Sequence, residues 1–190
     1  GITIYNPFHS IGLFSIYETD IIKNVDVWTG GFPSQYGGRI SAVVDVSTRD
    51  GNRKKFSGKL SASPFMAHAL LEIPIVKLKE DRNTSASLIL NTKVSYLDRT
   101  SKALYPYADK NGLPYAFYDV YGKFSVSAGK GNKFSITGFN FRDQTNFTAA
   151  KYLWNTFGIG ANFLAVPKNS NLYFNTHVSY SQYKIQLTEV

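Results

Sequence analysis

Apolar and polar residues alternate along most of the chain after residue 55, and this period of two predicts β-strands. The alternation is clearest in three segments, which are 85–96, 118–128 and 172–181. In the first of them every second residue is apolar or threonine, and the residues between are polar apart from Ile89. Weaker alternation predicts four more strands, at 56–63, 67–75, 133–142 and 153–165. The sequence therefore predicts seven strands, each with one apolar and one polar face.

The predicted strands are long for a soluble sheet, whose strands favour about 5–6 residues. Twelve residues at ~3.3 Å each reach ~40 Å, and at a tilt of ~40° they cross ~30 Å. The apolar band of an outer-membrane barrel is ~25 Å tall. The strand lengths therefore favour a membrane-spanning barrel.

The connections between the predicted strands also alternate in length. Two tight turns, at 128–133 and 167–171, and a somewhat longer polar one at 76–84 fall at one end. The connection at 97–116, and to a lesser degree that at 143–152, is longer and richer in aromatics, and both fall at the other end. Transmembrane barrels combine short periplasmic turns with longer extracellular loops, so we expect 97–116 and 143–152 to be extracellular. Three tyrosines on apolar faces are expected at that same end as an aromatic girdle, namely Tyr96, Tyr118 and Tyr180.

A soluble antiparallel sandwich is the alternative fold, because sandwich strands also alternate between a dry and a wet face. Alternation by itself does not separate the two folds. Strand length and loop alternation favour the membrane barrel.

Composition narrows the chemistry of this 190-residue chain. It has no cysteine, which excludes disulfides, thiol catalysis and cysteine-based zinc sites. No stretch approaches 18 consecutive apolar residues, so no transmembrane helix is expected. The formal net charge of +8 would suit nucleic acid or an acidic surface without establishing either. Because the sequence starts without Met and without a leader pattern, we expect a segment of a longer protein.

The stretch 20–52, DIIKNVDVWTGGFPSQYGGRISAVVDVSTRDGN, carries the most specific motif. A helical turn is expected near its start, followed by a strand, a glycine-rich loop and a second strand, 43–48. It resembles the end of the plug domain of TonB-dependent outer-membrane receptors. The family's plug motif is matched by Gly30, Gly31, Tyr36, Gly37 and Gly38, although many members separate the last two glycines.

The resemblance implies a mostly β fold in two parts. Residues 1–51 would be the C-terminal part of a plug domain, and residues 52–190 would be the first seven or so strands of a large antiparallel transmembrane β-barrel of 22 strands. It implies active import of a siderophore, vitamin, glycan or peptide across the outer membrane of a Gram-negative bacterium. The implied partners are outer-membrane lipid and the inner-membrane TonB complex, whose box is not in this chain, with a surface lipoprotein as a further candidate.

Two groups of residues are candidates for contact with the ligand. By resemblance, the segment near the start of the chain faces the external vestibule, which singles out Tyr5, Asn6, Phe8 and His9. In the long connection, Tyr105 and Tyr107 could stack on sugar or aromatic rings. The alternative for both groups is ordinary packing, of the plug against the barrel wall and within the loop.

No catalytic or metal-binding pattern is present in the sequence. The three histidines, His9, His68 and His177, have no ligand spacing, so we predict no metal site and no cofactor. No acid, base and nucleophile set forms from neighbouring positions, so an enzyme is not expected. The basic run at 53–55 lacks interleaved aromatics, and no nucleic-acid partner is predicted. The remaining alternative function is a soluble or surface-attached β-rich module that binds glycans or peptides.

Overall fold

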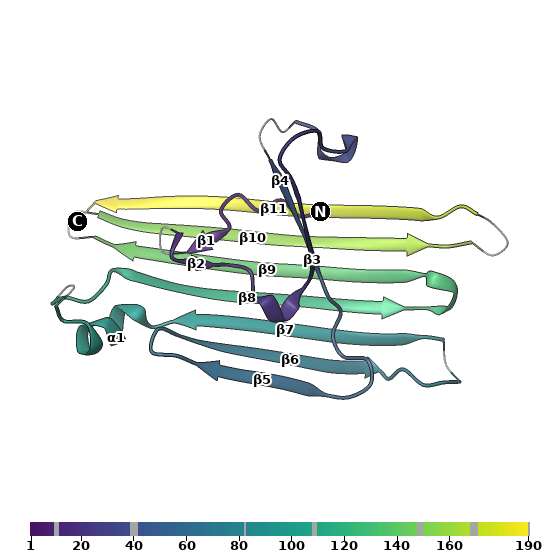
Figure 1. Cartoon of the computed structure of the whole chain (residues 1–190), viewed down its shortest axis with the longest axis horizontal. Coiled ribbons are helices and arrows are strands. Elements are labelled where there is room, and N and C mark those ends of the chain that lie inside the picture. The colour runs from purple at the N-terminus through teal and green to yellow at the C-terminus, as the bar shows by residue number, and fades with distance from the viewer. Residues whose placement is uncertain are drawn as a thin grey trace. The chain divides into compact units, whose positions relative to one another are not determined.

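The computed structural model describes residues 1–9, 12–38, 42–81, 83–107, 110–147, 150–167 and 171–189, and these residues are mostly β. Seven consecutive strands form one antiparallel sheet in chain order (Figure 1). They are β5 (Ser57–Ala62), β6 (Met66–Val76), β7 (Ser85–Ser95), β8 (Tyr115–Ser127), β9 (Lys133–Asn146), β10 (Ala150–Ala165) and β11 (Phe174–Glu189). The seven predicted strands and the mostly β fold class are confirmed.

The chain divides into two compact units, one of residues 1–16 with 50–190 and one of residues 17–49. The smaller unit contains a 3-10 turn at Thr19–Ile21, β3 (Ile22–Trp28), a 3-10 turn at Ser34–Tyr36 and β4 (Val43–Thr48). β3 and β4 pair antiparallel. The helical turn expected near residue 20 is thus a single 3-10 turn. The proposed division into plug and barrel at 51/52 stays a prediction.

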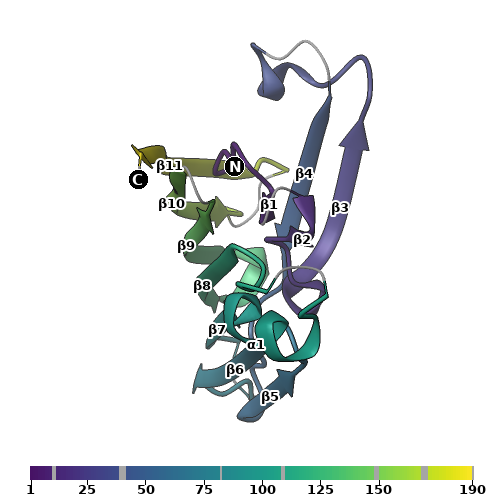
Figure 2. The same cartoon turned by 90° about the vertical axis from the view of Figure 1, so that its left-hand side faces the viewer.

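Residues 1–16 lie on one face of the seven-stranded sheet (Figure 2). They include a small two-stranded sheet formed by β1 (Phe8–His9) and β2 (Phe14–Ser15). The backbone oxygen of Ser15 accepts a hydrogen bond of 2.7 Å from Lys93 in β7, and that of Gly1 accepts one of 3.2 Å from Ser179 in β11. The segment therefore spans several strands of the sheet.

The two faces of the sheet differ sharply in polarity. We call the face with Asn91 and Lys93 the inner face, because residues 1–16 contact it, and the face with Leu90 and Val94 the outer face. In β7 the inner side chains are buried and mostly polar. The outer side chains Leu90 and Val94 are 39% and 46% exposed. Register extends both faces across the sheet, since residues directly opposite each other share a face.

The outer face carries a band of exposed apolar side chains, while charged groups concentrate on the inner face. Exposed outer-face positions include Val120, Ile136, Phe157, Ile159 and Val178. Buried inner-face positions include His68, Lys93, Asp119, Lys123 and Asp143. A sheet with one wet face normally has its polar side chains on that face. In this sheet the exposed face is the apolar one.

The last strand is longer than the alternation predicts. Beyond Tyr180 the pattern reverses: Gln182 and Lys184 fall on the outer face and Ile185 on the inner face. The ladder to β10 nevertheless continues to Glu189, because backbone hydrogen bonding does not depend on which face is apolar. Tyr180 pairs with Ile159 in the middle of the strand, so its expected place at the strand end is wrong.

The connections are less regular than expected. β9 ends at Asn146 and β10 begins at Ala150, so the long connection predicted at 143–152 is wrong. The other connection expected to be long, 97–116, contains a helix that the sequence did not predict, α1 (Leu97–Leu104). Its Leu97 and Ser101, one turn apart, are buried. Among the described residues, no helix is both long and apolar enough to cross a membrane.

Candidate ligand-facing site on the inner face

A buried cluster of charged groups joins the start of the chain to the sheet. His9 is 1% exposed, and its ring stacks on Phe117 of β8 with 4.3 Å between centroids. Its Nε2 lies 2.9 Å from the carboxylate of Asp119 in β8, and its Nδ1 lies 3.8 Å from Asp143 in β9. Both ring nitrogens thus face carboxylates, an arrangement that suits docking of the segment against the sheet.

Lys93 completes this cluster, which we call the His9 cluster: His9, Lys93, Asp119 and Asp143. The Lys93 ammonium lies 3.4 Å from Asp119 and donates its 2.7 Å hydrogen bond to Ser15. It is 2% exposed. Buried charges are tolerated only when they are paired and hydrogen-bonded, so strands β7, β8 and β9 and the segment 1–16 depend on one another here.

Two glycines of β10 make room for the first residues on the inner face. A Cβ at Gly158 would overlap the Phe139 ring and lie 2.8 Å from Ile2, and one at Gly160 would lie 3.0 Å from Ile2. The position opposite Gly160 on β11, Ser179, holds the Gly1 carbonyl. Larger residues at these two glycines would displace the segment.

The structure places the four predicted residues of this segment in different environments. Tyr5 and Phe8 are 58% and 51% exposed, and Tyr5 stacks on Tyr183 of β11 at 6.0 Å. The side-chain oxygen of Asn6 accepts a hydrogen bond from the backbone of Phe8. His9 is turned into the sheet. A ligand-facing role for Tyr5, Asn6, Phe8 and His9 stays a prediction, with Tyr5 and Phe8 the accessible members.

The other two predicted residues follow α1. Tyr105 stacks on Phe65, with 6.0 Å between centroids and 18° between planes. Tyr107 meets Tyr105 edge-on and is 84% exposed. The two tyrosines therefore form an aromatic group with the β5–β6 connection, and their role toward a ligand also stays a prediction.

An aromatic strip on the inner face was not predicted from the sequence. Tyr152 and Trp154, two residues apart on β10, stack at 5.5 Å, and Phe147 packs edge-on against Tyr152. Tyr115 of β8 meets Phe147 at 6.5 Å. The strip shares its face with the His9 cluster, since Trp154 pairs with Asp143. The signal that could have revealed it is the reversed alternation in this part of β10.

A second ionic cluster surrounds Asp50, in the segment that precedes β5. The Asp50 carboxylate lies within 2.6 Å of Arg53, 2.7 Å of Lys133 and 3.2 Å of Lys123, and Ser125 donates a 2.9 Å hydrogen bond to it. Burial by itself would raise the pKa of Asp50. The hydrogen bond from Lys133, the charges of Lys123 and Lys133 and the Ser125 hydroxyl outweigh burial and hold that pKa well below its ordinary value of 3.8.

Within the unit 17–49, the motif residues form a compact loop. The Tyr36 hydroxyl donates a 2.7 Å hydrogen bond to Asp45 of β4, and its ring packs on Trp28 at 5.2 Å. Gly31 and Gly38 have positive φ angles of 67° and 76°, a conformation that favours glycine. The neighbouring Gly30 and Gly37 do not have positive φ angles. Burial raises the pKa of Tyr17, and the charge of Asp45 raises it further.

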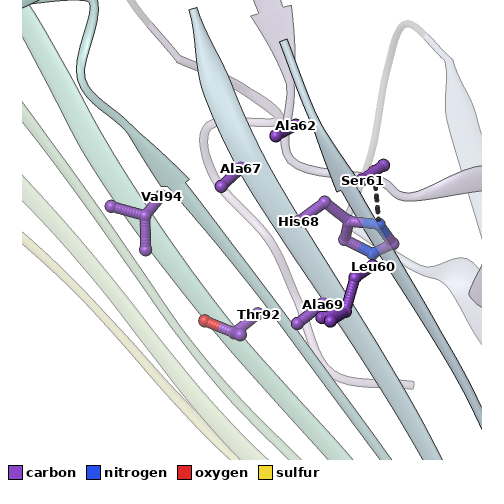
Figure 3. A pocket seen from close by; sticks show the side chains of 8 residues that line it. All are labelled: Leu60, Ser61, Ala62, Ala67, His68, Ala69, Thr92 and Val94. Atoms are coloured by element: carbon purple, nitrogen blue, oxygen red, sulfur yellow. Dashed lines mark hydrogen bonds between the residues drawn. The ribbon is translucent and has the colours of Figure 1, made fainter.

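A shallow depression lies on the outer face near the β5 edge (Figure 3). Small side chains at Ala62, Ala67 and Ala69 form its floor between Leu60 and Val94. His68 and Ser61 belong to the inner face, where His68 Nε2 lies 2.5 Å from Asn91. The depression offers no charged group for a polar ligand, so it is a weaker candidate than the inner face.

Comparison of the chain with known protein families, with curated proteins and with solved structures found no match.

Proposed function

We propose that the chain is part of a TonB-dependent outer-membrane receptor that imports a ligand into a Gram-negative bacterium. In this proposal residues 52–190 are neighbouring strands of a 22-stranded barrel, and residues 1–51 end its plug domain. The outer face would contact lipid, and the inner face would line the plugged lumen. Import would be driven by the inner-membrane TonB complex.

The observation that carries the proposal is the reversed polarity of the sheet. On the outer face of β8 the residues from Tyr118 to Val126 are apolar or glycine at every second position. At ~3.3 Å per residue they cover ~26 Å along the strand, which at a tilt of ~40° crosses ~20 Å, most of the ~25 Å band of outer-membrane barrels. Hydrocarbon accepts such a face, whereas water does not favour an apolar patch of this extent.

The apolar band crosses the strands obliquely, which is expected when strands tilt relative to the membrane normal. Tyr118, Arg142, Asn155 and Lys184 lie opposite one another in a single register row. This row is still within the band on β8 but already polar on β9, β10 and β11. Barrel strands tilt by about 35–45°, so a band level with the membrane must move along successive strands.

The edges of the sheet also support a larger assembly. Within the described part of the chain, β5 and β11 each pair with a strand on one side only. Unpaired backbone groups cost several kcal/mol each in lipid, so a membrane-embedded β11 requires a further strand. A 22-stranded barrel supplies one on each side.

The orientation of the sheet in the membrane follows from the end at which the strands extend beyond the apolar band. β9, β10 and β11 continue past it at the Asn146, Ala150 and Glu189 ends, where α1 also lies. Extracellular parts of such barrels are the longer ones, so we assign this end to the cell exterior. Ligand would then reach Tyr5, Phe8 and the aromatic strip from outside. A surface lipoprotein could cover this end.

The absence of cysteine makes a direct test simple. His177 and Val178 are neighbours on β11, both exposed, and they point to opposite faces. In the intact protein in bilayers, a spin label on Val178→Cys should collide with oxygen dissolved in lipid. A label on His177→Cys should collide with a water-soluble nickel complex. Equal access of the nickel complex to both labels, with monodisperse protein in buffer lacking detergent, would instead favour the soluble binding module.

A further inference from the structure

The charged residues on the outer face are few, and all are cations. The described strands β5 to β11 place many ionisable side chains on the inner face. On the outer face, register and exposure leave three charged residues, which are Arg142, Lys151 and Lys184. All three are exposed, and all lie toward the same ends of β9, β10 and β11. We call them the outer cations.

The outer cations are close enough to act together. Arg142 and Lys184 flank Asn155 in one register row, so their Cα atoms are two strand spacings, or about 10 Å, apart. Lys151 lies four residues from Asn155 on the same strand, at ~13 Å. Long side chains can converge over such distances. Among the described residues, no carboxylate pairs with any of the three.

Their position relative to the apolar band is specific. The row that holds Arg142 and Lys184 also holds Tyr118, and the next outer residue of β10 toward the band is Phe157. The outer cations therefore begin where the apolar side chains end. If the band lies in hydrocarbon, this is the level of the lipid headgroups, where tyrosine side chains also collect.

We propose that the outer cations bind the phosphate groups of anionic lipids in the outer leaflet, an inference that rests on the function proposed above. A guanidinium can hold a phosphate through two parallel hydrogen bonds, and lysine adds a second positive charge. A lipid fits this surface better than a free anion or an acidic peptide, because its acyl chains would cover Phe157 and Ile159 beside the cations. The Asn140 amide donates a 3.2 Å hydrogen bond to the side-chain oxygen of Asn155, and the amide nitrogen of Asn155 can donate to a bound phosphate.

The test compares two triple variants of the intact protein in phosphatidylcholine nanodiscs that contain diphosphorylated lipid A. Arg142→Gln/Lys151→Gln/Lys184→Gln removes the outer cations. The control, Arg99→Gln/Lys102→Gln/Lys110→Gln, removes one arginine and two lysines that are exposed in the connection after β7. Both variants lower the net charge equally and bury no new group. Native mass spectrometry counts the lipid A that stays bound.

We expect wild type and control to retain lipid A and the outer-cation variant to lose affinity on the order of a hundredfold, from three phosphate-attracted charges. Binding should also weaken as salt rises. The charge-conserving Arg142→Lys/Lys151→Arg/Lys184→Arg should still bind. Equal lipid A binding by both triple variants would overturn the lipid site while leaving the receptor proposal intact. Failure of the wild-type protein to enter nanodiscs would overturn both.

Discussion

Leu90 offers the sharpest test of which solvent covers the outer face. It occupies the middle of the apolar band, opposite Leu71 on one side and Gly122 on the other, and is 39% exposed. Leu78 has almost the same exposure, 42%, but lies in the connection after β6, beyond the band. Its structural contact is a backbone hydrogen bond to Arg53, which a substitution preserves. Leu90→Arg and Leu78→Arg therefore make the same chemical change at two equally exposed sites.

The expected magnitudes differ because only one site would lie in hydrocarbon. Arginine on the lipid face of a barrel costs about 2–4 kcal/mol at the bilayer midplane and ~0–1 kcal/mol near the interfaces. If both leucines faced water, either substitution would change the free energy of unfolding by no more than ~0.5 kcal/mol. Leu90→Arg should thus lower the free energy of unfolding by ~2 kcal/mol or more relative to Leu78→Arg.

The assay is reversible urea unfolding of the intact protein in lipid vesicles, followed by tryptophan fluorescence. With a denaturant slope of about 1–3 kcal/mol per molar, the Leu90→Arg midpoint should fall by roughly 1 M relative to that of Leu78→Arg. Coincident midpoints for the two variants would refute a lipid-covered outer face, and with it the importer.

Three further outcomes follow from the inner face. Lys93→Met leaves the Asp119 carboxylate short of a buried partner and should lower stability by about 3–5 kcal/mol, whereas the exposed Lys151→Met should have little effect in the same urea titration. Gly160→Val should release the start of the chain, seen as faster proteolysis before the sheet unfolds, and unchanged proteolysis would count against docking through this glycine. Because the pKa of Asp50 is lowered on folding, its contribution is present above its unfolded-state pKa of about 4 and is lost as pH falls toward the lower folded-state value. Asp50→Asn should therefore flatten the fall in the free energy of unfolding with acid, measured between about pH 2 and pH 5. An unchanged fall would contradict this role of Asp50.

The sheet itself was predictable because alternation is a local property. A residue's face in a strand follows from its parity, so Leu88, Leu90 and Val94 could be assigned to one face before any partner strand was known. Ile89 was recognisable as the exception, and it is fully buried on the inner face. The strand ends were less predictable where polarity reversed, as after Tyr180.

The candidate site was predictable only in part. The segment 5–9 was singled out, but the ionic partners on the sheet depend on tertiary structure: Asp119 of β8 pairs with His9 and Lys93, and Lys123, four residues further along β8, pairs with Asp50. The aromatic strip likewise depends on the pairing of β8, β9 and β10.

The sequence by itself determined the strands, their order along the chain and the polarity of each face, because these depend on the spacing of neighbouring side chains. Only the tertiary structure decided that residues 1–16 cover the inner face, that α1 interrupts the connection after β7 and that three cations gather on the outer face. Those features join residues far apart in the chain, and strand register and packing bring them together.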